Sequence, residues 1–478
     1  MQFNVIANAL LVSTSSRTLT VIDPSDGQPF DALQRSNAQD IDHAVHAARQ
    51  CYDAVWHRLG GAERGQLLMQ LSAKVTEHAD ELAALEQRDS GKPTRQARAD
   101  VQALARSLAF YAGASNMLRD DPPSSILDSD SVLTWREPYG VTGHLIPWTH
   151  PMPIFGQSVG AALAGGNVCV VKPSESASLS LLRVAQLAAE AGLPAGALNI
   201  VTGDGQEAGD ALARHPGIAH IRFAGRSSVG THVQQVAAER HCPVVLELGG
   251  KSPQMVFADA DLDIALPAIV NAIVQNAGQT GMAASRVLID TLLYEPLLKR
   301  LGKAFEQLRV GPAAMDLDLG PLIHARQQQR VWDFLSDAQV AGIPMVAQGQ
   351  IVDEAPEAGY FQAPTLLRDV PAEHRLAQEE IIGPVLCAMP FEDEDHAIEL
   401  ANVPCLCPAA GVWTRDSARQ LRMAKRIRSQ QVFINHYDAN SRAELPFDAA
   451  RSSGDRREQG VEALYSFTTP KTVTVHHS

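Results

Sequence analysis

The sequence has few cysteines, no excess of basic charge and no long hydrophobic run. Only six of its 478 residues are Cys, without a C-x-x-C pair or regular spacing. This pattern excludes a disulfide-stapled miniprotein and fits free thiols in a reducing compartment. Lys and Arg number 40 against 54 Asp and Glu, which gives a net charge of −14. An acidic chain has no general affinity for phosphate backbones or anionic lipids, so neither nucleic acid nor membrane is an expected partner.

Signals for secretion, membrane insertion and metal binding are also missing. No Lys or Arg precedes Arg17, so the positive region of a secretory signal is absent. The longest stretch of small apolar residues, 159–171, is too short to cross a bilayer. Cys405 and Cys407 have no further ligands at zinc spacing, and no metal site is predicted. We therefore expect a cytoplasmic protein.

Hydrophobic residues make up 45% of the chain and charged residues 20%, which is the composition of a globular protein. The length predicts about three domains, or two large ones with an appendage. Apolar residues recur at helical spacing over 41–55, 68–82 and 101–118, so the first 120 residues are predicted to be largely helical.

From Val141 onward, short apolar strands alternate with helices. This alternation predicts a parallel, doubly wound sheet, in which ligands bind beyond the carboxyl ends of the strands. A similar pattern resumes after Gly250 and runs to about residue 449. The tail, 471–478, alternates Thr and Val and reads as an edge strand that a partner subunit could use, with 132–137 as a second candidate. The expected strands are 143–147, 168–171, 198–201, 220–223 and 244–247, and the expected helices are 153–164, 178–191, 206–214 and 227–239.

Several short motifs follow one another in a specific order and at specific distances. Each alone is a weak signal, but together they resemble the NAD(P)-dependent aldehyde dehydrogenase superfamily from about Asp23 to His476. The motifs are Pro147-Trp148-Thr149-His150-Pro151, Lys172-Pro173-Ser174-Glu175, Phe223-Ala224-Gly225-Arg226-Ser227-Ser228-Val229-Gly230, Glu247-Leu248-Gly249-Gly250-Lys251-Ser252-Pro253, Gly278-Gln279, Glu379-Glu380-Ile381-Ile382-Gly383-Pro384 and Pro446-Phe447.

The resemblance implies an α/β fold with three parts. Residues 1–121 and 139–249 would form a Rossmann-type, parallel-sheet NAD-binding domain, and 250–449 an α/β catalytic domain. Residues 122–138 and 465–478 would form a small oligomerisation β-arm. Because family members are usually dimers or tetramers, we expect a homodimer or homotetramer.

The cofactor positions can be followed in physical terms. Gly225 and Gly230 lie between a strand and a helix, where glycines let a phosphate approach backbone amides. Glu175 follows a strand and can accept both hydroxyls of an adenosine ribose, but would repel a 2′-phosphate, so NAD is favoured over NADP. By resemblance, Lys172 and Glu175 hold that ribose, Trp148 lies by the phosphates and Glu380 holds the nicotinamide ribose. Further predicted cofactor-binding positions are Ile146, Ser174, Gly205, Phe223, Arg226 and Val229.

Arg226 stands where the family usually has a small Ser beside the pyrophosphate. A guanidinium there could pair with phosphate, or it could fill the space that phosphate needs. The sequence leaves both alternatives open.

The family oxidises an aldehyde through a Cys thiolate that adds to the carbonyl, after which hydride passes to the nicotinamide. A Glu-activated water then hydrolyses the thioester, and an Asn with a backbone N–H holds the oxyanion. Glu247 matches the Glu. The thiol position is Gly281 and the Asn position is Thr149. The resemblance therefore implies an aldehyde dehydrogenase impaired in the thiol mechanism.

Other departures occur at Ile382, Leu406-Cys407-Pro408, Asp448-Ala449 and Arg456-Arg457-Glu458. An engineered removal of one thiol would leave these motifs intact, so we expect Gly281 to be natural. One hypothesis is a non-catalytic NAD-binding, structural or regulatory subunit. Another is a working NAD-dependent dehydrogenase of altered mechanism, an oxidoreductase that takes a small aldehyde or alcohol with Glu247 as base.

Overall fold

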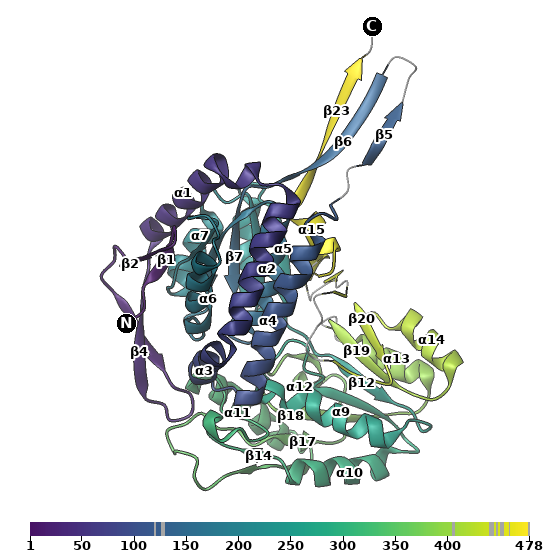
Figure 1. The fold of residues 1–478 in the computed structure, drawn as a ribbon. Helices are drawn as coiled ribbons and strands as arrows, with labels where there is room; N and C mark the ends of the chain where they lie inside the picture. Colours follow the sequence, from purple (N-terminus) through teal and green to yellow (C-terminus); the bar gives the residue numbers. More distant parts are fainter. Residues whose placement is uncertain are drawn as a thin grey trace.

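The computed structural model describes residues 1–118, 121–125, 130–403, 407–438, 444–445, 448–449, 454–457 and 459–476. Two large sheets, each covered by helices, form the body of the molecule, and a narrow three-stranded arm extends from it (Figure 1). No helix among these residues is long and apolar enough to cross a membrane.

The N-terminal region begins with strands and continues with helices. Four short strands occupy the first 36 residues, which corrects the expectation that this region is largely helical throughout. The apolar spacing over 68–82 is shared by two helices that meet at His78, so one predicted helix is in fact two. The strands are β1 (Asn4–Ile6), β2 (Ala9–Leu11), β3 (Thr18–Ile22) and β4 (Pro29–Gln34), and the helices are α1 (Ala38–Ala54), α2 (Gly61–Glu77), α3 (Ala79–Ser90) and α4 (Thr94–Ala114).

The first large sheet has nine strands in the order β2-β1-β9-β8-β7-β10-β11-β22-β21. Its five central strands are parallel, and their order reverses direction between β7 and β10. In a doubly wound sheet, such a switch point opens a crevice beyond the carboxyl ends of the strands. The strands are β7 (Val141–Ile146), β8 (Val168–Pro173), β9 (Leu198–Ile200), β10 (His220–Gly225), β11 (Val244–Leu248), β21 (Asp448–Ala449) and β22 (Gly454–Arg457).

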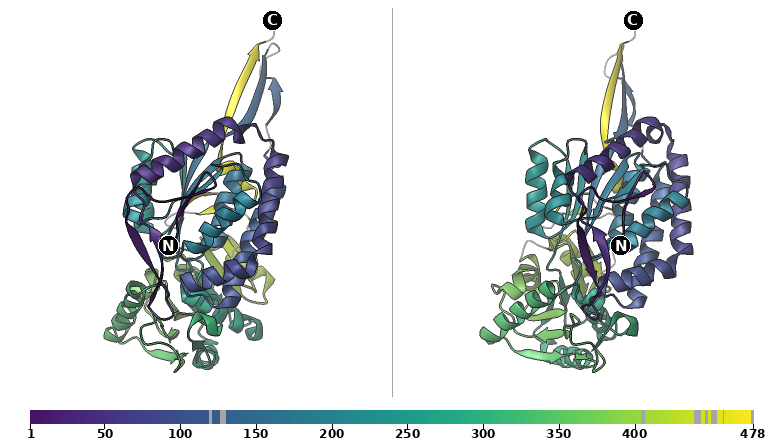
Figure 2. Two further views of the ribbon diagram at one scale, coloured as in Figure 1. Left: turned by 60° about the vertical axis from the view of Figure 1, so that its left-hand side comes forward. Right: turned by 90° about the vertical axis from the view of Figure 1, so that its left-hand side faces the viewer.

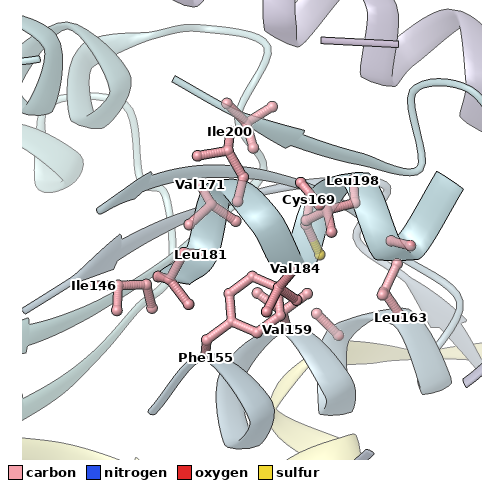
Figure 3. Close-up of a cluster of buried hydrophobic side chains, with 14 of the residues drawn as sticks. Ile146, Phe155, Val159, Leu163, Cys169, Val171, Leu181, Val184, Leu198 and Ile200 are labelled. Carbon is pink, nitrogen blue, oxygen red and sulfur yellow. The ribbon is translucent and has the colours of Figure 1, made fainter. Parts of the chain in front are cut away.

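Helices pack on this sheet through a continuous apolar core. Side chains from β8 and β9 meet side chains from α5 and α6, and all of those labelled in Figure 3 are buried. The labelled residues are Ile146, Phe155, Val159, Leu163, Cys169, Val171, Leu181, Val184, Leu198 and Ile200. The helices of this region are α5 (Pro151–Ala164), α6 (Leu179–Glu190), α7 (Asp210–Arg214) and α8 (Ser227–Ala238), with a π turn over Gly205–Gly209.

The second large sheet has seven strands in the order β15-β17-β18-β13-β12-β19-β20, all parallel except β15. Its strands are β12 (Pro253–Val256), β13 (Arg286–Asp290), β15 (Met345–Gln348), β17 (Thr365–Leu367), β18 (Val385–Phe391), β19 (Ala409–Trp413) and β20 (Gln431–Ile434). Its helices are α9 (Leu262–Val274), α10 (Tyr294–Glu306), α11 (Ala325–Val340), α12 (Arg375–Gln378), α13 (Glu394–Asn402) and α14 (Ser417–Arg426), and the short strands β14 (Arg309–Val310) and β16 (Gln350–Ile351) pair beside them.

The arm is an antiparallel sheet in the order β23-β6-β5. Strand β23 (Thr468–His476) pairs along its whole length with β6 (Asp130–Pro138), and β5 (Asp121–Ser125) lies on the other side of β6. The arm projects beyond the helices in all three views (Figures 1 and 2). The predicted tail strand therefore pairs within its own chain, after the short helix α15 (Glu462–Ser466).

Candidate active site

The predicted site residues gather where the first sheet reverses its strand order. Trp148 and Thr149 follow β7, and Gly225 ends β10, the hydrogen-bonded neighbour of β7, with Arg226 directly after it. The carboxyl ends of adjacent parallel strands lie at one edge of a sheet, so these residues face one crevice. The pairing of β7 with β10 therefore brings together residues that are far apart in the sequence.

A cavity of about 180 Å³ occupies this crevice. Its walls come from both large sheets and from helices α4 and α5. The predicted site residues among its lining are Trp148, Thr149, Gly225, Arg226, Glu247, Gly281 and Glu380. Other lining side chains include Gln102, Arg106, Gln157, Met282, Ile382 and Pro408.

Gly281 lies in this cavity with room for a side chain. A Cβ built on it would meet its nearest neighbours, Gly249 Cα and Leu248 O, at 3.7 and 4.0 Å. These are ordinary van der Waals separations, so a small side chain fits without displacing the backbone. None of the described residues that line the cavity is a cysteine.

The loop that precedes Gly281 is tied to the segment after β7. Asn276 Nδ2 donates to the backbone oxygens of Thr149 and Gln279 at 2.8 and 3.0 Å. Gln279 Oε1 in turn accepts from the amide of Ile323 at 2.9 Å. Two buried amide side chains thereby hold the backbone that carries Gly281 next to the predicted oxyanion position.

Glu247, at the end of β11, is held by an ion pair. Its Oε2 accepts a hydrogen bond from Arg222 Nη2 at 2.8 Å. Arg222 is only 2% exposed, whereas the Glu247 side chain is 24% exposed and reaches the cavity. The carboxylate predicted to act as a base is thus already engaged by a buried guanidinium.

Glu380 lies against the backbone that joins the two sheets. Its Oε1 accepts from the amide of Gly250 at 3.1 Å, and burial raises the pKa of the carboxyl to about 7. A Cβ on Gly249 would lie 1.9 Å from Glu380 Oε2, so a side chain there would displace the carboxylate.

Arg226, the residue directly before α8, reaches across the crevice. Its Nη2 donates to Gln327 Oε1, on α11, at 3.1 Å. The Gln327 amide is itself anchored, because its Nε2 donates to the backbone oxygens of Ile381 and Ile382. Desolvation lowers the pKa of Arg226, and the neighbouring guanidinium groups of Arg330 and Arg326 act in the same direction.

The remaining predicted cofactor positions surround the cavity without lining it. Lys172 Nζ donates to Glu175 Oε2 at 3.0 Å, and the amide of Ser174 donates to the oxygen of Ile146 at 2.8 Å. Gly205 lies in the exposed π turn. Phe223 is buried in β10, and Val229 is exposed on α8.

Two features of this region are compatible with a dinucleotide. No side chain caps the N-terminus of α8, so its first-turn amides are available to a phosphate. Glu175 is half-buried at the carboxyl end of β8, where a ribose can reach it. The Arg226–Gln327 hydrogen bond is the feature that crosses this path.

A second cavity, of about 540 Å³, lies against α4 and α9. It contains none of the predicted site residues but shares Ala99, Asp100 and His150 with the first. Burial lowers the pKa of His150 to about 3, so this imidazole is neutral between the two cavities.

Sequence reasoning missed Arg222 and Gln327, which hold two of the predicted residues. The signal for Arg222 was a charged residue inside an otherwise apolar strand. Gln327 lies in a polar helical segment, which gives no such signal. Pro446-Phe447, Leu406 and Glu458 lie outside the described residues.

Comparison with known proteins agrees with this geometry. The model of the aldehyde dehydrogenase family matches residues 11–473. An aldehyde dehydrogenase from Emericella nidulans is 34% identical over 472 residues, which cover 98% of this chain and 94% of that protein. The crystal structure of a "Putative Aldehyde Dehydrogenase" from Burkholderia cenocepacia is 60% identical, with a TM-score of 0.97 and full coverage of both chains.

An aldehyde dehydrogenase from Bacillus cereus, solved as its NAD⁺ complex, is 34% identical with a TM-score of 0.96. That match covers 100% of this chain and 97% of the other. The expected α/β fold and the family resemblance are both confirmed, and the chain belongs to the aldehyde dehydrogenase family.

Proposed function

We propose that this protein binds NAD and a small aldehyde in the crevice but does not carry out thiol-dependent oxidation. The observation that carries the proposal is Gly281, which lines the cavity with Glu247 and leaves the space of a side chain unfilled. Without a nucleophilic thiol, the covalent intermediate of the family chemistry cannot form. Loss of such a nucleophile typically lowers turnover by roughly 10⁴–10⁶-fold.

The proposed cofactor contacts follow from the strand ends. Glu175 would accept the adenosine ribose hydroxyls, with Lys172 beside it, and the amides at the start of α8 would face the pyrophosphate. Glu380 would accept from the second ribose. When bound, the nicotinamide supplies a hydride acceptor. The relative solved with NAD⁺ supports NAD, and the carboxylate of Glu175 favours NAD over NADP.

Thr149 is the second change on the carbonyl side. Its hydroxyl can donate one hydrogen bond to an oxyanion, but a shorter side chain reaches less far than the amide that the family uses. Loss of one such donor costs roughly 3 kcal/mol of transition-state stabilisation. Both changes lie in the same cavity and favour binding over turnover.

We also assign residues 1–121 and 139–249 to cofactor binding, 250–449 to the catalytic domain, and 122–138 with 465–478 to an oligomerisation arm. Strands β23 and β5 are the edges of the arm sheet, and edge strands can pair with another chain. A homodimer or homotetramer is therefore our proposed assembly.

A second candidate function is a dehydrogenase of non-thiol mechanism. Glu247 lines the cavity together with Glu380, so a base and a cofactor-facing carboxylate are both in place. Such an enzyme would take hydride from a hydrated aldehyde or an alcohol while Glu247 accepts the proton.

A fluorescence titration of the purified protein with NADH, repeated with NADPH, tests cofactor binding without knowledge of the substrate. Saturable binding with NADH preferred supports the proposal, and no binding at millimolar cofactor refutes it. A panel of aldehydes and alcohols with NAD then separates the candidates. Turnover by the natural sequence indicates the non-thiol enzyme, whereas no turnover by the natural sequence and no substantial NAD reduction after Gly281→Cys indicate the binding protein.

A further inference from the structure

Arg222 is a buried charge that the family chemistry described above does not use. It lies in β10, one strand away from Glu247, and only 2% of it is exposed. Its Nη2 donates to Glu247 Oε2 at 2.8 Å. A buried guanidinium needs a hydrogen-bonded counter-charge, because desolvation of an unpaired ion is costly.

The strand register shows where Arg222 lies relative to Glu247. Strands β10 and β11 are parallel, with Ala224 opposite Glu247 and Arg222 opposite Val245. Arg222 therefore lies two residues nearer the amino ends of the strands than the residue opposite Glu247. The cavity opens beyond the carboxyl ends, around Gly225, Arg226 and Gly281. The Glu247 side chain lines this cavity, and its Oε2 is at the same time engaged by Arg222 from within the sheet.

We propose that Arg222 is a positioning residue. Its ion pair with Glu247 prevents this carboxylate from activating water at an acyl group on position 281. The inference rests on the proposed roles of Glu247 and of position 281. A charge-assisted hydrogen bond is roughly twice as strong as a neutral one, and its rupture would leave Arg222 buried without this partner. Glu247 therefore stays at Arg222 even when a thiol is supplied.

Ester hydrolysis tests this inference without any cofactor. With p-nitrophenyl acetate, an introduced thiolate attacks the ester carbon, a C–S bond forms, and p-nitrophenolate leaves with the electron pair of the broken C–O bond. Water then attacks the thioester carbon and passes one proton to the Glu247 carboxylate. The C–S bond breaks with its electron pair on sulfur, which restores the thiolate. Acetic acid leaves and ionises in bulk water, and Glu247 returns its proton to solvent. The first step gives a burst of p-nitrophenolate, and the second sets the steady-state rate.

The experiment compares full-length variants in the Gly281→Cys background. We expect a burst close to one p-nitrophenolate per site, followed by slow turnover. Arg222→Met should leave the burst unchanged and raise the steady-state rate by at least about tenfold, a modest share of what a general base supplies. Arg222→Lys retains a cation and should remain slow. Glu247→Gln added to Arg222→Met should abolish the gain.

Arg222→Gln provides the same comparison with a polar side chain if the methionine variant does not fold. A burst with no acceleration in either neutral variant overturns the role of Arg222 and leaves the assignment of position 281 intact. Fast turnover by Gly281→Cys alone also overturns it. The absence of any burst overturns the assignment of position 281 itself, and the inference with it. A gain that survives Glu247→Gln shows that the released group is not Glu247, which likewise refutes the inference.

Discussion

Replacement of Arg226 by serine perturbs a contact that crosses the proposed cofactor path. The guanidinium donates to Gln327 at 3.1 Å, from the N-terminus of α8 to α11. A pyrophosphate that docks at the α8 amides must displace this side chain or pair with it. A hydrogen bond from a charged donor contributes about 1.5–3 kcal/mol, and Arg226 is exposed to solvent screening, so we take the lower end. If displacement dominates, Arg226→Ser should lower the Kd for NADH by about tenfold.

The measurement is the same fluorescence titration, carried out on the wild type, Arg226→Ser and Arg326→Ser. Arg326 is an exposed guanidinium close enough to Arg226 to lower its pKa, so its removal controls for a simple change of charge. We expect that control to change the Kd little, because exposed charges are screened. Weaker binding by Arg226→Ser would refute the reasoning, since it would mean that the guanidinium pairs with the phosphates.

Two further predictions concern stability. Burial raises the pKa of Glu380 from its ordinary value of 4.5 to about 7, so the folded state prefers the protonated carboxyl. The free energy of unfolding therefore falls as pH rises from about 4.5 to about 7. Glu380→Gln should therefore stabilise the protein at pH 8, by at most about 3 kcal/mol, and not at pH 4.5; thermal unfolding at both pH values checks this, and an equal gain at both contradicts it. Gly278→Ala should destabilise the fold by several kcal/mol, because Gly278 has φ +70° and a Cβ there would lie 2.4 Å from the backbone of Gly383. A variant with an unchanged unfolding midpoint would show that this loop relaxes easily.

The fold was most predictable where apolar strands alternate with capped helices. The expected strand 168–171 lies within β8, and the expected helix 178–191 contains α6, which Gly192 follows with φ +86°. The short N-terminal strands were missed because β2, for example, has only three residues, all exposed, and therefore shows no alternation, although it pairs with β1 in a local hairpin. Neither Gly nor Pro marks the break at His78, so its helical spacing continues without a visible stop.

The candidate site was predictable only as a set of motifs. Residues at or just beyond strand ends, such as Gly225 and Trp148, meet because parallel strands end at one edge. Their partners were not predictable, since Arg226 and Gln327 are 101 positions apart and lie under different sheets. The orientation of Glu247 likewise depends on the β10–β11 register, which brings Arg222 within 2.8 Å.

Both proposed carbonyl-side positions, 281 and 149, depart from the family pattern. Arg222 also engages Glu247, whereas on the cofactor side Glu175 and Glu380 keep the family residues and Arg226 departs. If only the thiol were absent, Gly281→Cys should restore turnover, because the position has room for the side chain. The weaker oxyanion donor and the engaged base each impose a further loss, and such effects combine non-additively. We therefore expect the restored thiol to be acylated yet to turn over slowly, which is the behaviour of a pocket organised to hold a ligand.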